Sequence, residues 1–346
     1  MRWTKTVTMV EAHAEGEVGR IVTGGIGKLP GDTMLETLNW LNSDGNDLRR
    51  FLVNEPRGTA QMSTCLLLPP KHPDADAAFI VLQGDQAHAM SGSNTICLTT
   101  VLLETGQLEM TEPITRYTLD TASGLVEVAA ECKNGKCVAV QLRPADCYAE
   151  RLDQMITVDG IGEVKLDIAF GGIFYALVDV NQLGLSISPD QARALVSAGS
   201  EIHRTVNRTL DIAHPDYPGL EGISYVMFTD KNADGEMVGA TIMPPGRVDR
   251  SPCGTGNSAR LAVMVARGEA NAGDAFVARS IINSRFDVSI VDVKERDGYP
   301  SITPQIRGRG WIHGMHQIGV DPDDPYPQGF TVSDCWGEAL DLINDG

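Results

Sequence analysis

Two short segments of the chain place a hydroxyl or a thiol directly before a glycine-rich turn that opens into an apolar stretch. Residues 90–95 read Met-Ser-Gly-Ser-Asn-Thr, and residues 249–258 read Asp-Arg-Ser-Pro-Cys-Gly-Thr-Gly-Asn-Ser. If each turn begins a helix, the first backbone N–H groups of that helix lack intrahelical partners and can hold an anion. Two such segments facing each other would bind a carboxylate and place Ser91 and Cys253 on opposite faces of the adjacent carbon. This pattern predicts proton transfer at the α-carbon of an amino acid.

The interpretation of Cys253 as a catalytic residue depends on its neighbours. A free cysteine is often no more than a small buried apolar side chain. Here the thiol follows Pro252 and precedes Gly254, so we expect the helix dipole and nearby N–H groups to stabilise its thiolate. Ser91 alone would be an ordinary N-cap, and its catalytic interpretation comes from its correspondence with Cys253.

The residues after each candidate catalyst match in type and are expected to bind substrate. Gly92 corresponds to Gly254, and Ser93 to Thr255. Glycine lets the backbone approach a ligand closely, so these four residues are predicted to donate backbone N–H groups to a substrate carboxylate. Asp249 is predicted to accept a hydrogen bond from a substrate ammonium group.

The elements that position these residues are short strands and a few helices. The segments 94–104 and 257–267 are apolar on nearly every side and are followed by glycine, which predicts two buried helices. A Ser-Pro-Asp-Gln sequence at 188–191 predicts a capping box and a helix to about residue 210, and 32–41 and 46–53 are further helix candidates. Asn-Gly at 134–135 predicts a two-residue hairpin turn. Short β-branched runs predict strands at 20–23, 78–82, 125–130, 138–142, 225–229, 238–243 and 287–293.

The spacing of the motifs indicates an internal repeat. The segment 13–16, His-Ala-Glu-Gly, precedes Ser91 by about the distance at which 170–172, Phe-Gly-Gly, precedes Cys253. We therefore expect an α+β protein with two pseudo-symmetric halves, 1–155 and 156–346, joined within 149–164. Each half is expected to be an antiparallel, barrel-like sheet around a central helix, with the site between the halves. The C-terminal segment, with a short last helix, is expected to pack back on the first half.

Composition excludes several classes of protein. The 346 residues carry a formal net charge of −18, which argues against nucleic acid or an anionic membrane as a partner. Seven irregularly spaced cysteines and the lack of an apolar leader predict a reduced, cytoplasmic protein. The segment 230–235 resembles the start of a calcium loop, but Thr241 stands where a bidentate Glu is needed, so a hairpin turn is expected. Cys132 and Cys137 are expected to face each other across a ladder as free thiols, and neither a metal nor an organic cofactor is predicted.

The chain resembles the proline racemase family over nearly all of its length. The similar segments are 11–17, 22–25, 54–58, 169–176 and, most specifically, 249–256, Asp-Arg-Ser-Pro-Cys-Gly-Thr-Gly. The resemblance implies a diaminopimelate epimerase-like fold of two domains with the site between them. It also implies catalysis without a cofactor and, as is usual in the family, a homodimer.

One departure from the family pattern shapes the expected reaction. Racemases and 4-hydroxyproline epimerases of the family typically read Met-Cys-Gly-His-Gly where this chain reads Met-Ser-Gly-Ser-Asn. The serine–cysteine pair resembles that of the branch that contains trans-3-hydroxy-L-proline dehydratases. Where the epimerases have a histidine shortly before the second motif, this chain has Tyr225. A serine hydroxyl is a weaker acid than a thiol, which handicaps exchange between two carriers. In trans-3-hydroxy-L-proline the α-hydrogen and the 3-hydroxyl share a face, so one group could serve both.

The sequence therefore predicts dehydration of trans-3-hydroxy-L-proline to Δ1-pyrroline-2-carboxylate. Which of Ser91 and Cys253 takes the α-proton stays open. The alternative is a 4-hydroxyproline 2-epimerase that exchanges a proton at the same carbon. Proline racemase and diaminopimelate epimerase are less favoured because both use paired cysteines. A binding protein for imino acids without catalysis is the alternative from another class.

Overall fold

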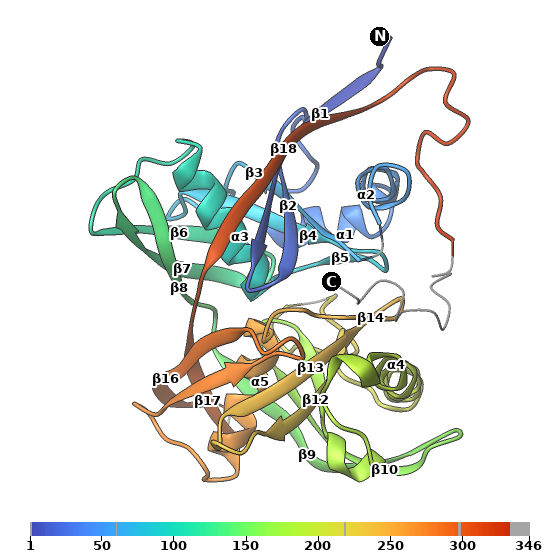
Figure 1. Ribbon diagram of the computed structural model, residues 1–346, viewed down its shortest axis with the longest axis vertical. Helices are drawn as coiled ribbons and strands as arrows, with labels where there is room; N and C mark the ends of the chain where they lie inside the picture. The colour runs from blue at the N-terminus through green and yellow to red at the C-terminus, as the bar shows by residue number, and fades with distance from the viewer. Residues whose placement is uncertain (1, 60, 218, 297–298, 333–346) are drawn as a thin grey trace.

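The computed structural model describes residues 2–59, 61–217, 219–296 and 299–332 and has two lobes, one above the other in Figure 1. The upper lobe contains the helices α1 (Met34–Leu41), α2 (Asn46–Val53) and α3 (Gly92–Glu104). Its strands are β1 (Lys5–Ala14), β2 (Glu17–Gly24), β3 (Ser63–Leu68), β4 (Ala77–Leu82), β5 (Ala87–His88), β6 (Ile114–Thr121), β7 (Gly124–Lys133) and β8 (Lys136–Arg143).

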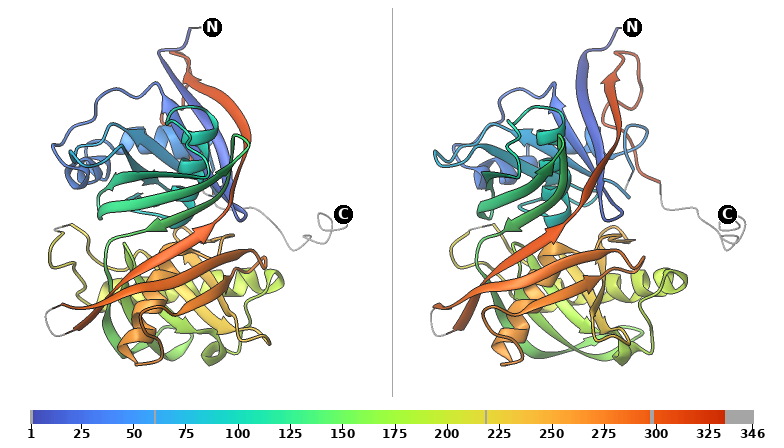
Figure 2. Two further views of the ribbon diagram at one scale, coloured as in Figure 1. Left: turned by 90° about the vertical axis from the view of Figure 1, so that its left-hand side faces the viewer. Right: turned by 60° about the vertical axis from the view of Figure 1, so that its left-hand side comes forward.

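The lower lobe contains the helices α4 (Ala192–Thr209) and α5 (Gly254–Ala266) and the short 3-10 helices Val180–Leu183 and Pro189–Gln191. Its strands are β9 (Cys147–Val158), β10 (Gly162–Phe170), β11 (Phe174–Asp179), β12 (Tyr225–Lys231), β13 (Met237–Met243), β14 (Arg247–Val248), β15 (Ala275–Arg279), β16 (Arg285–Arg296) and β17 (Tyr299–Gly308). The last described strand, β18 (Gly310–Val320), runs back along the upper lobe and pairs with β1, as the two views of Figure 2 show.

The same order of strand pairings occurs twice. In the upper lobe β2 pairs with β3, β3 with β4, β4 with both β5 and β6, β6 with β7, and β7 with β8. In the lower lobe β11, β12, β13, β14, β15, β16 and β17 repeat these pairings in the same sequence and with the same directions. The helix between the fourth and fifth strands of each series is α3 in one lobe and α5 in the other. The division at 155/156 falls within β9 and stays a prediction.

The sheets are mixed, so the expectation of purely antiparallel sheets is wrong. β2–β3, β4–β6, β11–β12 and β13–β15 are parallel pairs. A parallel pair needs a crossover connection, and the 38 residues between β2 and β3 include α1 and α2. Long connections of this kind give no local signal of the direction in which the next strand will run.

The two central helices lie in the core, as their sequences predict. Every residue of α3 from Gly92 to Leu103 is buried, and so are most residues of α5. Burial on all sides fixes each helix axis, and therefore fixes the backbone N–H groups at its N-terminus.

Several local predictions are confirmed and one is wrong. Lys133 pairs with Lys136 around the 134–135 turn, Cys132 faces Cys137, and 230–235 lies at the β12–β13 hairpin. The predicted capping box at Ser188 does not form, because its side chain caps no N–H, and Gln191 instead accepts from the backbone N–H of Ser186. The predicted C-terminal helix lies outside the described residues. Within the described ranges, no helix is both long and apolar enough to span a membrane.

Candidate functional site

The N-termini of α3 and α5 meet at their first residues, Gly92 and Gly254. A Cβ atom built on Gly92 would lie 3.0 Å from the Cα of Gly254, and one on Gly254 would lie 3.2 Å from the Cα of Gly92. Only glycine permits this approach. The unpartnered N–H groups of both helices therefore converge on one point between the lobes.

Ser91 is the N-cap of α3, with extended backbone at φ −153°. Its Oγ accepts hydrogen bonds from Asn94, at 3.0 Å from Nδ2 and 3.4 Å from the backbone N–H. The hydroxyl is therefore held at the entrance to the helix by donors that the sequence pattern did not indicate.

Cys253 occupies the corresponding place before α5, in the left-handed region at φ +67°. This conformation is uncommon for a residue with a side chain and is typical of functional sites. The Sγ lies 3.3 Å from the hydroxyl of Tyr175, which also contacts Thr255 Oγ1 at 2.6 Å. Burial, followed by the charge of Asp249, raises the pKa of the Cys253 thiol to about 12. Near neutral pH the residue is therefore a thiol, in contrast to the expected dipole-stabilised thiolate.

Asp249 lies directly after β14 and is connected to Cys253 by a short chain of hydrogen bonds. Its Oδ1 accepts from the backbone N–H of Ser251 at 2.8 Å, and the Ser251 hydroxyl accepts from the N–H of Cys253 at 3.1 Å. Burial and then the charge of Glu17 raise the pKa of Asp249 to about 8, although Arg247 opposes this shift. A cationic ligand group beside Asp249 would favour loss of its proton.

Glu17 and Arg247 form a buried ion pair between the lobes that was not predicted from the sequence. Their side chains are 3% and 2% exposed, and Arg247 Nη1 lies 2.5 Å from Glu17 Oε1. Arg247 also donates to Ser63 Oγ at 3.0 Å and to the carbonyl oxygen of Gln61 at 2.9 Å, both in the upper lobe. The only sequence signals for this pair are weak ones: Glu17 ends the 11–17 motif, and Arg247 lies two residues before Asp249.

All the predicted site residues line one small pocket between the lobes. The predicted residues in its wall are Ser91, Gly92, Ser93, Asp249, Cys253, Gly254 and Thr255. The wall also includes Tyr225, whose place the sequence left open, and the residues that were missed, Glu17, Ser63, Gln83, Met90, Asn94, Tyr175, Met243 and Arg247. The Tyr225 hydroxyl donates to Gln83 Oε1 at 3.0 Å. Among the described residues, no three His, Cys, Asp or Glu side chains are grouped to hold a metal ion.

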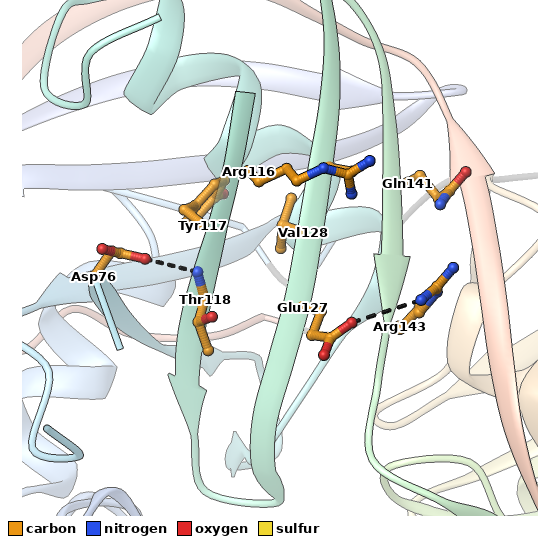
Figure 3. Close-up of a pocket in the computed structure, with 9 residues that line it drawn as sticks. Asp76, Arg116, Tyr117, Thr118, Glu127, Val128, Gln141 and Arg143 are labelled. Carbon is orange, nitrogen blue, oxygen red and sulfur yellow. Dashed lines mark hydrogen bonds and ion pairs between the residues drawn. The ribbon is translucent and has the colours of Figure 1, made fainter. Parts of the chain in front are cut away.

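A larger hollow of about 810 Å3 lies over β6, β7 and β8 (Figure 3) and contains none of the predicted residues. Its wall includes an exposed pair of Arg143 and Glu127, 3.7 Å apart, and the bond from the Thr118 N–H to Asp76. The smaller pocket has the buried, convergent polar groups that chemistry requires, whereas the larger hollow is open to the surface.

Comparison with known proteins identifies the relatives of this chain. The family model described as proline racemase matches residues 9–331. The protein named 4-hydroxyproline 2-epimerase of Agrobacterium fabrum is 52% identical over 339 residues, which are 97% of this chain and 98% of that protein. The crystal structure of a hydroxyproline epimerase from Agrobacterium vitis, with bound trans-4-hydroxy-L-proline, superposes with a TM-score of 0.94 at 49% identity. It covers 99% of this chain and 100% of that one. A Bacillus anthracis phenazine biosynthesis protein of the PhzF family has a TM-score of 0.54 at 13% identity over 92% of this chain and all of its own, which shows a shared fold alone.

These findings confirm the resemblance to the family and contradict the predicted reaction. The relatives at about 50% identity over their full length are named as epimerases of 4-hydroxyproline. The expected dehydration of trans-3-hydroxy-L-proline, and the dehydratase branch inferred from the serine–cysteine pair, are therefore wrong. The findings support the epimerase, which was the alternative to that reaction.

Proposed function

This chain belongs to the proline racemase family, and on that premise we propose that it inverts the α-carbon of 4-hydroxyproline. The observation that carries the proposal is the meeting of two helix N-termini, with Ser91 before one and Cys253 before the other. The names of the relatives supply the substrate, because those proteins are described as acting on or binding 4-hydroxyproline.

The substrate carboxylate is proposed to lie at the junction of α3 and α5. The first N–H groups of each helix, at Gly92, Ser93, Gly254 and Thr255, have no partner within their helix. When the α-proton leaves, negative charge moves from the carbon into the carboxylate. Fixed N–H groups in a buried pocket stabilise this charge without reorganising, and in many enzymes such stabilisation contributes more to the rate than any other effect.

The ring nitrogen is proposed to pair with Asp249. A bound imino acid is a zwitterion whose cationic nitrogen favours the Asp249 carboxylate over its protonated form.

Inversion then needs one proton to leave and another to arrive on the opposite face. The accepting carrier must have lost its own proton beforehand. The Cα–H bond then breaks as the α-proton passes to this deprotonated carrier, and the electron pair of the bond enters the carboxylate π system. The second carrier gives its proton to the other face, and the electron pair forms the new C–H bond. Ser91 and Cys253 fill these roles in turn, one for each direction of the reaction.

Dehydration was predicted from a comparison of an isolated hydroxyl with an isolated thiol, and the pocket changes both groups. Ser91 Oγ accepts two hydrogen bonds from Asn94, and burial makes Cys253 a weaker acid than a free thiol. The hydrogen bonds to Ser91 and the burial of Cys253 both reduce the difference in acidity between the hydroxyl and the thiol, on which the prediction of dehydration rested.

Proton NMR of the purified protein in D2O tests the proposal. In one tube, trans-4-hydroxy-L-proline should give its 2-epimer with deuterium at Cα, and Ser91→Ala and Cys253→Ala should each abolish this inversion. A second tube holds trans-3-hydroxy-L-proline as the control, and no Δ1-pyrroline-2-carboxylate should form in it. An unchanged 4-hydroxy compound would overturn the proposal, and so would wild-type rates in either variant.

A further inference from the structure

Asn94 lies one helical turn after Ser91, and its side chain contacts the serine hydroxyl. Its Nδ2 donates to Ser91 Oγ at 3.0 Å, and its backbone N–H lies 3.4 Å from the same oxygen. The hydroxyl can accept two hydrogen bonds and donate one. With both acceptor positions facing Asn94, the Ser91 proton is directed to Ser93 Oγ, 3.4 Å away, or to the pocket.

Cys65 on β3 determines which way the Asn94 amide faces. The thiol of Cys65 donates to Asn94 Oδ1 at 3.2 Å, and its side chain is completely buried. Burial raises the pKa of Cys65 well above its usual range, so the thiol keeps its proton and acts as a donor. A donor on this side requires the amide oxygen there, which turns the NH2 group toward Ser91.

The slot around Asn94 is completed by Gly19 on β2. A Cβ at position 19 would lie 2.8 Å from Asn94 Oδ1 and 2.9 Å from Cys97 Cβ. Asn94 itself is 2% exposed. Strand, helix and thiol together hold the amide in one orientation.

The other helix has Gly256 at the position of Asn94, and its asparagine, Asn257, comes one residue later and makes different contacts. Asn257 on α5 directs its Nδ2 to the backbone oxygens of Pro252 and Cys253, at 2.6 and 3.0 Å. Cys253 Sγ instead contacts the hydroxyl of Tyr175 at 3.3 Å. Each candidate carrier therefore has its own polar neighbour. Ser91 contacts Asn94 of its own helix, whereas Cys253 contacts Tyr175 of β11.

We propose that Asn94, oriented by Cys65, is a positioning residue that stabilises deprotonated Ser91 and so allows a serine to serve as one of the two proton carriers. The inference rests on the proposed epimerisation. When Ser91 gives its proton to Cα, the O–H bond breaks and its electron pair stays on the oxygen as negative charge. The Asn94 NH2, the Asn94 N–H and the N-terminal end of α3 all face that charge, and hydrogen bonds to a charged form favour it.

The test separates the two carriers with a substrate that reports proton removal from one face. The probe is 4-hydroxyproline carrying fluorine at C3, prepared in both C2 configurations. After the α-proton leaves, the electron pair forms a double bond to C3 as the C–F bond breaks, and a fluoride electrode measures the released fluoride. Each C2 epimer needs only the carrier that faces its α-hydrogen, so Ser91→Ala and Cys253→Ala identify the epimer that each carrier serves.

Asn94→Leu should lower fluoride release from the Ser91 epimer by about 10- to 100-fold, because a hydrogen bond to a charged group is lost. Release from the Cys253 epimer should stay within about threefold of wild type. Tyr175→Phe is the matched control and should show the reverse selectivity. Equal losses from both epimers in Asn94→Leu, or no loss from either, would overturn the inference.

Two further variants keep the test valid if Asn94→Leu does not fold. Asn94→Asp keeps the shape and replaces the donor by an acceptor, so it should impair the Ser91 epimer at least as much. Cys65→Ala releases the amide and should weaken the same epimer, whereas Cys65→Ser keeps a donor and should restore it. If Ser91→Ala or Cys253→Ala itself fails to distinguish the epimers, the proposed function fails, and this outcome differs from failure of the Asn94 variants alone.

Discussion

Binding of a zwitterionic imino acid should release a proton from the pocket at neutral pH, because Asp249 holds one until the ligand arrives. Burial and the charge of Glu17 raise the pKa of Asp249 to about 8. A carboxyl group with that pKa is about nine-tenths protonated at pH 7 and about one-tenth protonated at pH 9. Since the cationic nitrogen favours the carboxylate, we expect release of about 0.9 proton per site at pH 7 and about 0.1 at pH 9. By linkage, ligand affinity should rise about tenfold from pH 6 to pH 7 and level off above pH 8.

Isothermal titration calorimetry measures this proton directly. The heat of binding is recorded in buffers of different ionisation enthalpy, and its slope against that enthalpy gives the number of protons released. Ser91→Ala protein prevents turnover during the titration. Glu17→Gln removes one cause of the raised pKa of Asp249, so less than 0.9 proton should be released at pH 7.

The matched ligand is cyclopentanecarboxylate, which keeps the ring and the carboxylate and lacks the nitrogen. It should bind at pH 7 without releasing a proton. If 4-hydroxyproline released none either, or if both ligands released equal amounts, Asp249 would not be the group that receives the ring nitrogen.

Two further predictions concern the junction of the lobes. Arg247→Met should lower the free energy of unfolding by about 3–5 kcal/mol, because it leaves Glu17 buried without its counter-ion. In urea unfolding, the Glu17→Gln, Arg247→Met double variant should lose less than the sum of the single losses, and additive losses would contradict a coupled pair. Gly92→Ala places a Cβ 3.0 Å from the Cα of Gly254, which should separate the helix N-termini and lower kcat/KM for epimerisation about 100-fold. Gly27→Ala, whose Cβ would have no neighbour within 4 Å, is the control, and equal activity of the two variants would contradict this reasoning.

The parts of the fold that sequence predicts are those coded over short distances. The central helices α3 and α5 are apolar on all sides and are followed by glycine, and Asn134-Gly135 determines a two-residue turn. The parallel pairing of β2 with β3 depends on the path of the helices between them, and no local pattern reports it. The sheets were therefore predicted as antiparallel although four pairs are parallel.

The site divides in the same way. Ser91, Cys253 and the residues after them could be predicted because each of the two groups lies within one contiguous motif at the start of a helix. Asn94 stands in the same motif and was passed over, because its role depends on Cys65, 29 residues earlier in the chain. The pair of Glu17 with Arg247 joins residues 230 positions apart. The sequence therefore indicates the candidate proton carriers more readily than the groups that set their acidity.

The acidity of the two carriers is what decides whether a serine and a cysteine can exchange protons in both directions. Efficient exchange needs carriers with similar proton affinity, because a proton that one carrier holds much more tightly is not returned. In the free amino acids the thiol is far the stronger acid. Burial and the charge of Asp249 raise the pKa of the Cys253 thiol to about 12, while the Asn94 amide and the N-terminus of α3 favour the deprotonated form of Ser91. The pocket therefore brings the acidities of the two proposed carriers closer together, and a pair that looks mismatched in sequence would become suited to the proposed inversion.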